Sequence, residues 1–338
     1  MQRDYFLDQT ESHLDQTGSH LSRTSPFFDQ TTKHFDQITR PFNQTNRPFD
    51  QAEGLRRLLA QTSARVVTVA AACAGSGVTS VVINLATALA ATGKRVLILD
   101  ENISPNNVGN RLALKPRYDL LNMVRGEKSW REIMLLPQPG VRVLPVARAI
   151  QALPLLSALE RATLLNCLRD AAHGIDVVLV DAASVMGRHP SVSLMPTQPL
   201  LLVLNTTAHA ITESYSMIKQ MSVQDGRRGF LTVVNQACVA QQAHAVFSNM
   251  ARVAQRHLQV QADYLGHIPT DEKLARAAQL CSAVNEVYPA AQSAQAFAGI
   301  ARKLMNYLAS TTEESSSLPD VVQQLMQQTR SLNRVTVN

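Results

Sequence analysis

Eight consecutive residues near the start of the chain's apolar part could bind phosphate. They read Cys-Ala-Gly-Ser-Gly-Val-Thr-Ser over residues 73–80. In a phosphate-binding loop, glycines let backbone N–H groups turn onto the phosphate oxygens, while a lysine and a hydroxyl complete the charge and the metal site. Here the glycines and hydroxyls are present, but the loop contains no lysine. We expect a nucleotide-binding loop of reduced charge, formed by Gly75, Ser76, Gly77, Val78, Thr79 and Ser80.

The missing charge leaves two interpretations of this loop. A charge-assisted contact to phosphate contributes about 1.5–3 kcal/mol, so two lost contacts would weaken binding by roughly two to four decades. Backbone amides and the helix dipole remain and could still hold an anion. The alternative is a glycine turn without a ligand, kept only for close packing of the helix on the strand.

Apolar runs alternate with helical patterns from residue 65 onward. The runs are nearly continuous in valine and leucine, which is typical of strands covered on both faces in a parallel sheet. Right-handed crossovers between such strands give an α/β, doubly wound, mainly parallel sheet of about seven strands. Strands are expected at 65–72, 95–99, 141–146, 176–180, 199–205, 229–235 and 264–268, and helices at 79–91, 157–172, 210–220, 241–259, 271–279 and 290–308.

Composition divides the chain into five segments. Residues 1–48 repeat a leucine or phenylalanine every seven residues, most of them followed by Asp-Gln or Asn-Gln. Only one position per heptad is dependably apolar and prolines interrupt the repeat, so we predict a disordered tail rather than a coiled coil. The other expected segments are a short helix at 49–60, the α/β domain at 61–309, a linker at 310–317 and an amphipathic helix at 318–338.

Composition also limits the class of protein. The net charge is +6, but the basic residues are scattered and aromatic residues make up only 5%, so nucleic-acid binding is not expected. The four cysteines, at positions 73, 167, 238 and 281, form no C-x-x-C pair, which favours reduced thiols over disulfides or zinc. No apolar run approaches the roughly 18 residues that span a bilayer. A cytoplasmic protein is expected.

The loop and the strand ends resemble the MinD/ParA class of P-loop ATPases, over roughly residues 60–308. That class places a signature lysine at the start of its loop and a second lysine before the threonine; here these positions are Cys73 and Val78. Its catalytic aspartate, two residues after the aspartate that ends the second strand, is replaced by Asn102. The resemblance therefore implies a P-loop fold of the SIMIBI class whose catalytic positions Cys73, Val78 and Asn102 are degenerate.

The same resemblance assigns the remaining ligands. Mg²⁺ would be held at Thr79, Asp100 and Asp181, the last of them acting through water, and Asn235 matches the asparagine that contacts the base. The implied cofactors are ATP or ADP with Mg²⁺, bound weakly, with little or no turnover. Arg148 and Arg188 lie on loops where either could restore the missing charge, but surface arginines are the simpler interpretation.

Residues 49–59 predict a helix that forms against a partner. Asp50 can cap it and Glu53 can complete a capping box, while ten or so residues are too few to be helical alone. The run Asp-Gln-Ala-x-x-Leu-Arg before a MinD-like domain resembles the FlhG (FleN/YlxH) family of flagellar-number regulators. In that family this element docks on FlhF, an SRP-type GTPase, and stimulates its GTP hydrolysis. The resemblance assigns partner binding to Asp50, Gln51, Ala52, Leu55 and Arg56. An ordinary lead-in helix is the alternative.

The C-terminal segment has an apolar stripe at helical spacing. Leu318, Val322 and Leu325 lie on it, whereas the polar face is rich in glutamine and has no lysine. Because a membrane-surface helix normally has a cationic face, packing onto the domain is favoured over membrane binding.

Two functions follow from these features. The first is a regulator of flagellar number or placement that activates FlhF while its own ATP site is degenerate. The alternative is an ATP-dependent switch that still binds and slowly hydrolyses ATP while it dimerises at the membrane or cell pole. A cellulose-synthesis relative of the same class is a third reading, which the 50–56 element disfavours. Flagellar switch or transcriptional proteins stay open as further partners, and so does a homodimer.

Overall fold

The computed structural model describes residues 64–182, apart from 104 and 106, residues 198–311, and Leu318, Val322 and Gln323. The predicted repeat, the 50–56 element and Arg188 lie outside the described residues, as does most of the C-terminal segment.

The described strands form a single eight-stranded sheet with the order β3-β4-β2-β5-β1-β6-β7-β8. Every neighbouring pair is parallel except β3 with β4, which is antiparallel. The strands are β1 (Arg65–Ala70), β2 (Val96–Asp100), β3 (Leu135–Gln138), β4 (Val141–Pro145), β5 (Val177–Asp181), β6 (Leu200–Asn205), β7 (Gly229–Ala237) and β8 (Gln261–Pro269).

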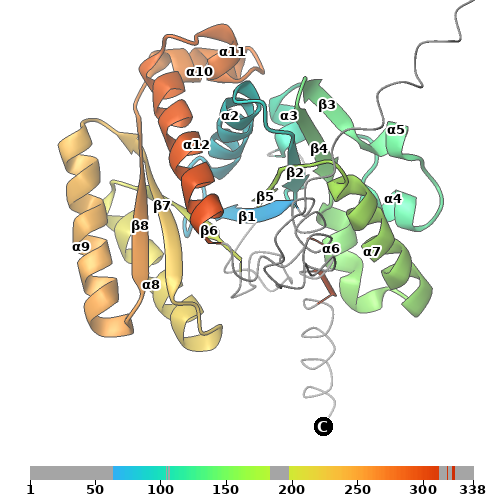
Figure 1. Ribbon diagram of the computed structural model, residues 1–338, viewed down its shortest axis with the longest axis horizontal. Coiled ribbons are helices and arrows are strands. Elements are labelled where there is room, and N and C mark those ends of the chain that lie inside the picture. Colours follow the sequence, from blue (N-terminus) through green and yellow to red (C-terminus); the bar gives the residue numbers. More distant parts are fainter. Residues whose placement is uncertain are drawn as a thin grey trace, which may run out of the picture. The chain divides into compact units, whose positions relative to one another are not determined.

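Helices cover both faces of this sheet (Figure 1). The helices are α2 (Val78–Ala91), α3 (Val108–Arg111), α4 (Leu120–Val124), α5 (Trp130–Ile133), α6 (Ala147–Ala152), the 3₁₀ turn η1 (Leu153–Leu155), α7 (Ala158–Ala172), α8 (Ala208–Gln224), α9 (Ala240–Leu258), α10 (Glu272–Gln279), α11 (Val284–Val287) and α12 (Gln292–Ser310).

Alternate strand residues point to different helix layers, as the pleat of a strand requires. Val67 and Val69 of β1 pack in one cluster with α2 and α12. Val66 of β1 packs on the opposite side, with α4, α6 and α7, and α8 and α9 cover β6 and β7 in a third cluster. The expected doubly wound α/β fold is confirmed, with strands buried on both faces.

One strand was missed by sequence reasoning. The four residues of β3 include Pro137, and they pair antiparallel at the edge of the sheet with an irregular register. Proline lacks the N–H group needed in a central strand but is tolerated at an edge. The sheet therefore has eight strands where about seven were expected.

The start of the C-terminal segment packs on the domain. Leu318 and Val322 are helical and each 1% exposed, in the same apolar cluster as Leu164 and Leu168 of α7. These contacts favour the packing interpretation for Leu318 and Val322.

Candidate functional site

The glycine loop connects β1 to α2 with a backbone that only glycine adopts easily. Gly75 and Gly77 have φ values of 79° and 86°, in the left-handed region. Gly77 is the N-cap of α2, and no side chain of the described residues caps the helix. Within that part of the chain the first turn therefore has no side-chain cap for its N–H groups, which is the property that an anion-binding helix terminus needs.

The two lysine positions of the loop hold apolar or weakly polar side chains. Val78 is half-buried and packs against the cluster around α2, and Cys73 is half-exposed. The hydroxyl of Ser76 donates to the carbonyl oxygen of Cys73 at 2.8 Å, which closes the loop on itself. The loop thus offers backbone amides and hydroxyls to a phosphate but no side-chain charge of its own.

Two carboxylates end neighbouring strands beside this loop. Asp100 and Asp181 are paired in register at the carboxyl ends of β2 and β5. Asp100 is 1% exposed and accepts from the backbone N–H groups of Asn102 at 3.1 Å and Val108 at 2.7 Å. Burial raises the pKa of Asp100 to about 6, against the opposing effect of these hydrogen bonds.

Asp181 is the more unusual of the two carboxylates. It is fully buried, and neither of its oxygens has a hydrogen-bond partner among the described residues. Burial, and then the charge of Asp100, raise the pKa of Asp181 well above its ordinary value, while the Thr79 hydroxyl and Asn102 lie near enough to oppose the shift in part. A buried carboxylate without a donor is unfavourable unless a cation compensates it.

This arrangement fits Mg²⁺. The predicted metal residues Thr79, Asp100 and Asp181 come together, and hydroxyl and carboxylate oxygens are the ligands that Mg²⁺ prefers. The described residues contain no group of three or more His, Cys, Asp or Glu side chains arranged for a metal ion. Water and phosphate oxygens would therefore supply the remaining ligands.

Asn102, at the position where the resemblance implies a catalytic aspartate, has a structural contact. The side-chain amide of Asn102 donates to the backbone carbonyl of Asp181 at 3.2 Å. An amide in this place ties the ends of β2 and β5 together, but it cannot take up a proton as a carboxylate would.

Asn235 lies against the loop. Its amide Nδ2 donates to the carbonyl oxygen of Ser76 at 2.8 Å, and the residue is 5% exposed. The resemblance predicts that Asn235 contacts the base of a nucleotide. In this structure its amide contacts the backbone of the glycine loop.

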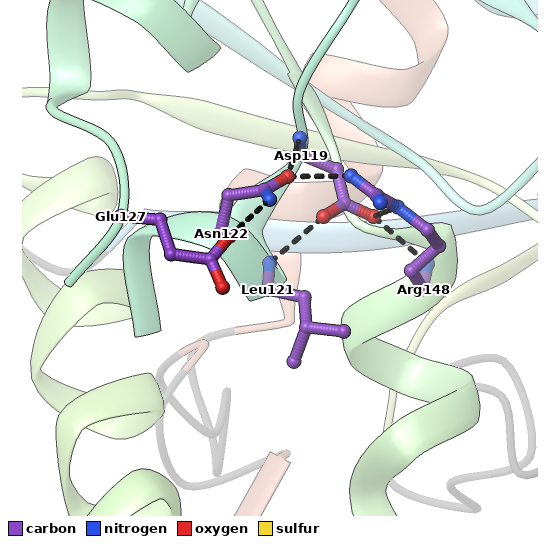
Figure 2. Close-up of polar contacts among 5 residues, drawn as sticks. All are labelled: Asp119, Leu121, Asn122, Glu127 and Arg148. Atoms are coloured by element: carbon purple, nitrogen blue, oxygen red, sulfur yellow. Dashed lines mark hydrogen bonds and ion pairs between the residues drawn. The ribbon is translucent and has the colours of Figure 1, made fainter. Parts of the chain in front are cut away.

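Arg148 is bound to other residues. Figure 2 shows its guanidinium against Asp119 and Asn122, where Nε donates to Asp119 Oδ2 at 3.0 Å and Nη2 donates to Asn122 Oδ1. The interpretation of Arg148 as a structural arginine is therefore favoured over a role in supplying charge to the loop. Asp119 and Asn122 were not predicted as partners of Arg148. Their Asp-x-x-Asn spacing could have indicated the helix start, because the two residues form a capping box on α4.

Comparisons with known proteins agree with this fold. A family model described as an AAA domain matches residues 64–227. The antiactivator FleN of Pseudomonas aeruginosa is 33% identical over 71% of this chain and 86% of its own length. The flagellum site-determining protein YlxH of Helicobacter pylori is 23% identical over 60% of this chain and 68% of its own.

Solved structures show the same fold. MinD of Aquifex aeolicus matches 72% of this chain and 97% of its own with a TM-score of 0.56 and 21% identity. MinD of Pyrococcus horikoshii, solved with Mg-ADP, matches 74% of this chain and 99% of its own with a TM-score of 0.54 and 17% identity. Among the described residues, no helix is both long and apolar enough to cross a bilayer.

Proposed function

Because the chain belongs to the FleN/YlxH (FlhG) family of MinD/ParA-type P-loop ATPases, we propose that it regulates flagellar number or placement as an activator whose own ATP site is degenerate. The proposed partner is an FlhF-type GTPase, bound through Asp50, Gln51, Ala52, Leu55 and Arg56. The chemistry would take place in the partner, where Gln51 would help to orient the GTPase residues.

One observation carries the degenerate-site part of this proposal. The two positions that should bring cationic side chains to the phosphates hold Cys73 and Val78, and Val78 packs into the apolar cluster around α2. A cationic residue acting across a phosphate-transfer site contributes about three to five decades of rate. Backbone amides alone can bind an anion without supplying that stabilisation, so weak binding and little turnover are expected.

The experiment measures GTP hydrolysis by the cognate FlhF in the presence of this protein. Wild type is compared with Gln51→Ala, and each is measured with and without ATP. Stimulation that disappears in Gln51→Ala and does not depend on ATP is the expected result. Gln61→Ala, the same substitution ten residues further along the chain, is the matched control. No stimulation by wild type would overturn the proposed function.

A second function is supported by the oxygen groups that lie at the predicted cation site. The buried carboxylate of Asp181 and the nearby hydroxyl of Thr79 are the side chains that a Mg²⁺–ATP switch needs. When bound, Mg²⁺ would neutralise phosphate charge, with Thr79, Asp100 and Asp181 as its residues and the amides of residues 75–80 around the phosphates. Saturable ATP turnover that is lost in both Asp181→Asn and Thr79→Ala would establish this switch in place of the degenerate site.

A further inference from the structure

A backbone kink near the end of β7 orients Asn235 toward the phosphate loop. Gln236 has a φ of 56°, which is rare for a residue with a side chain, and the register between β7 and β8 is irregular between Val234 and Ala237. The kinked N–H of Gln236 donates to Asn235 Oδ1 at 3.0 Å. With its oxygen engaged in this way, the Asn235 side chain presents its NH₂ group as a donor.

That donor binds the peptide group that begins the helix of the phosphate site. Asn235 Nδ2 donates to the carbonyl oxygen of Ser76, 159 positions away in the sequence. Asn235 also lies close to the next residue, Gly77: a Cβ added to Gly77 would lie 2.5 Å from Asn235 Nδ2. Two features therefore favour glycine at position 77, the positive φ of its backbone and the close approach of the Asn235 side chain.

We propose that Asn235 is a positioning residue of the phosphate loop, holding the Ser76–Gly77 peptide in the orientation that presents the loop amides to an anion. The inference rests on the proposed nucleotide site only where nucleotide binding by the Asn235 variant is measured. Its physical basis is preorganisation: a loop without lysine has no side-chain charge to offer and depends on its backbone amides, and amides that are already oriented lose less freedom on binding.

The direct test is amide hydrogen exchange of the full-length, nucleotide-free protein. In Asn235→Ala, exchange of the Val81 amide, which donates to the Gly77 carbonyl oxygen at 2.9 Å, should accelerate about tenfold, which corresponds to the loss of one hydrogen bond, while β1 and β5 keep their protection. Asn205→Ala is the matched control. Asn205 ends β6 in register with Asn235, and its amide donates to the Gln236 side chain at 2.9 Å in an exposed position.

Asn235→Asp provides a readout that a general packing defect would not give. At pH 7 the introduced carboxylate faces the Ser76 carbonyl without a proton to donate, so the protection of the Val81 amide should be lost. When the pH falls far enough to protonate that carboxyl, it can donate to the carbonyl again and protection should return, after correction for intrinsic exchange rates. Wild type and Asn205→Ala should show no such recovery.

Each outcome decides the proposal. Unchanged exchange of the Val81 amide in Asn235→Ala, equal acceleration in Asn205→Ala, or a loss of protection in Asn235→Asp that pH does not reverse would overturn it. The second readout is calorimetric titration with Mg-ATP, in which Asn235→Ala should bind about tenfold more weakly than wild type. A wild type that binds no Mg-ATP would count against the nucleotide site, while the exchange result would still decide the role of Asn235.

Discussion

Arg148 and Asp119 form an ion pair, with 3.0 Å between Nε and Oδ2, that joins the start of α6 to the start of α4 (Figure 2). The Asp119 side chain is 6% exposed and that of Arg148 is 50% exposed. The backbone N–H of Arg148 also donates to Asp119 Oδ2, and that of Leu121 donates to Oδ1. The buried carboxylate is thus the centre of the contact and the arginine one of its donors.

The two partners of this ion pair should contribute unequally to stability. Asp119→Ala removes a helix cap and leaves two backbone N–H groups without their acceptor, so the free energy of unfolding should fall by about 2–4 kcal/mol. Arg148→Ala removes a half-exposed charge and should cost about 1 kcal/mol or less. Urea denaturation of both variants measures the difference. Equal losses would contradict the assignment of Asp119 as the centre.

A lysine restored to the phosphate loop should strengthen nucleotide binding. Val78→Lys should raise the affinity for Mg-ATP about tenfold to a hundredfold, which is the contribution of one charge-assisted contact. Val239→Lys is the control, because this substitution adds the same charge at the start of another helix. Val239 is the N-cap residue of α9 and is 55% exposed. Calorimetry measures both affinities. A wild type that already binds as tightly as Val78→Lys would contradict the weakened site.

Asp271 should stabilise the fold in a pH-dependent way. It caps α10 through the N–H of Lys273 and accepts from the N–H and hydroxyl of Ser293 at the start of α12. Burial acts to raise the pKa of Asp271, but the hydrogen bonds from Ser293 and Lys273 outweigh it, and the pKa is lowered. A lowered pKa means that the charged form stabilises the fold above the ordinary value of 3.8 and that this stabilisation is lost as the pH falls through the folded-state pKa.

The variant Asp271→Asn tests this sign. At pH 7 it should lower the free energy of unfolding by about 1 kcal/mol, a value reduced for partial exposure to solvent. The gap between wild type and variant should narrow as the pH falls below about 4. Urea denaturation across this pH range measures it, and a gap that widens toward acid would contradict the prediction.

The C-terminal segment should contribute to stability through its buried residues. Leu318→Ala should lower the free energy of unfolding by about 2–4 kcal/mol, because Leu318 is 1% exposed in the cluster beneath α7. Leu155→Ala is the matched control, since Leu155 is 87% exposed and should change stability little. Thermal unfolding compares the two, and a silent Leu318→Ala would show that the segment adds no packing energy.

The sequence by itself determined the fold class and the order of the site's elements. Continuous valine and leucine runs predicted buried parallel strands, and the expected strand at residues 176–180 is displaced by one residue from the observed β5, Val177–Asp181. Such patterns are local, because burial on both faces is visible in each run. Gly75 and Gly77 were likewise identified as loop residues from the pattern of a phosphate-binding loop, and both have the positive φ values that glycine adopts easily.

Only the tertiary structure decided which polar groups meet. The amide of Asn235 reaches Ser76 across 159 positions, and Arg148 reaches Asp119 across 29. No local pattern encodes these pairs, because each depends on the sheet order and on a side chain oriented by its neighbours. That the Asp181 carboxylate has no hydrogen-bond partner among the described residues is also a tertiary property. Its burial results from strands and loops that are far apart in the sequence. That burial raises the pKa of the carboxyl, which the identity of the residue alone could not predict.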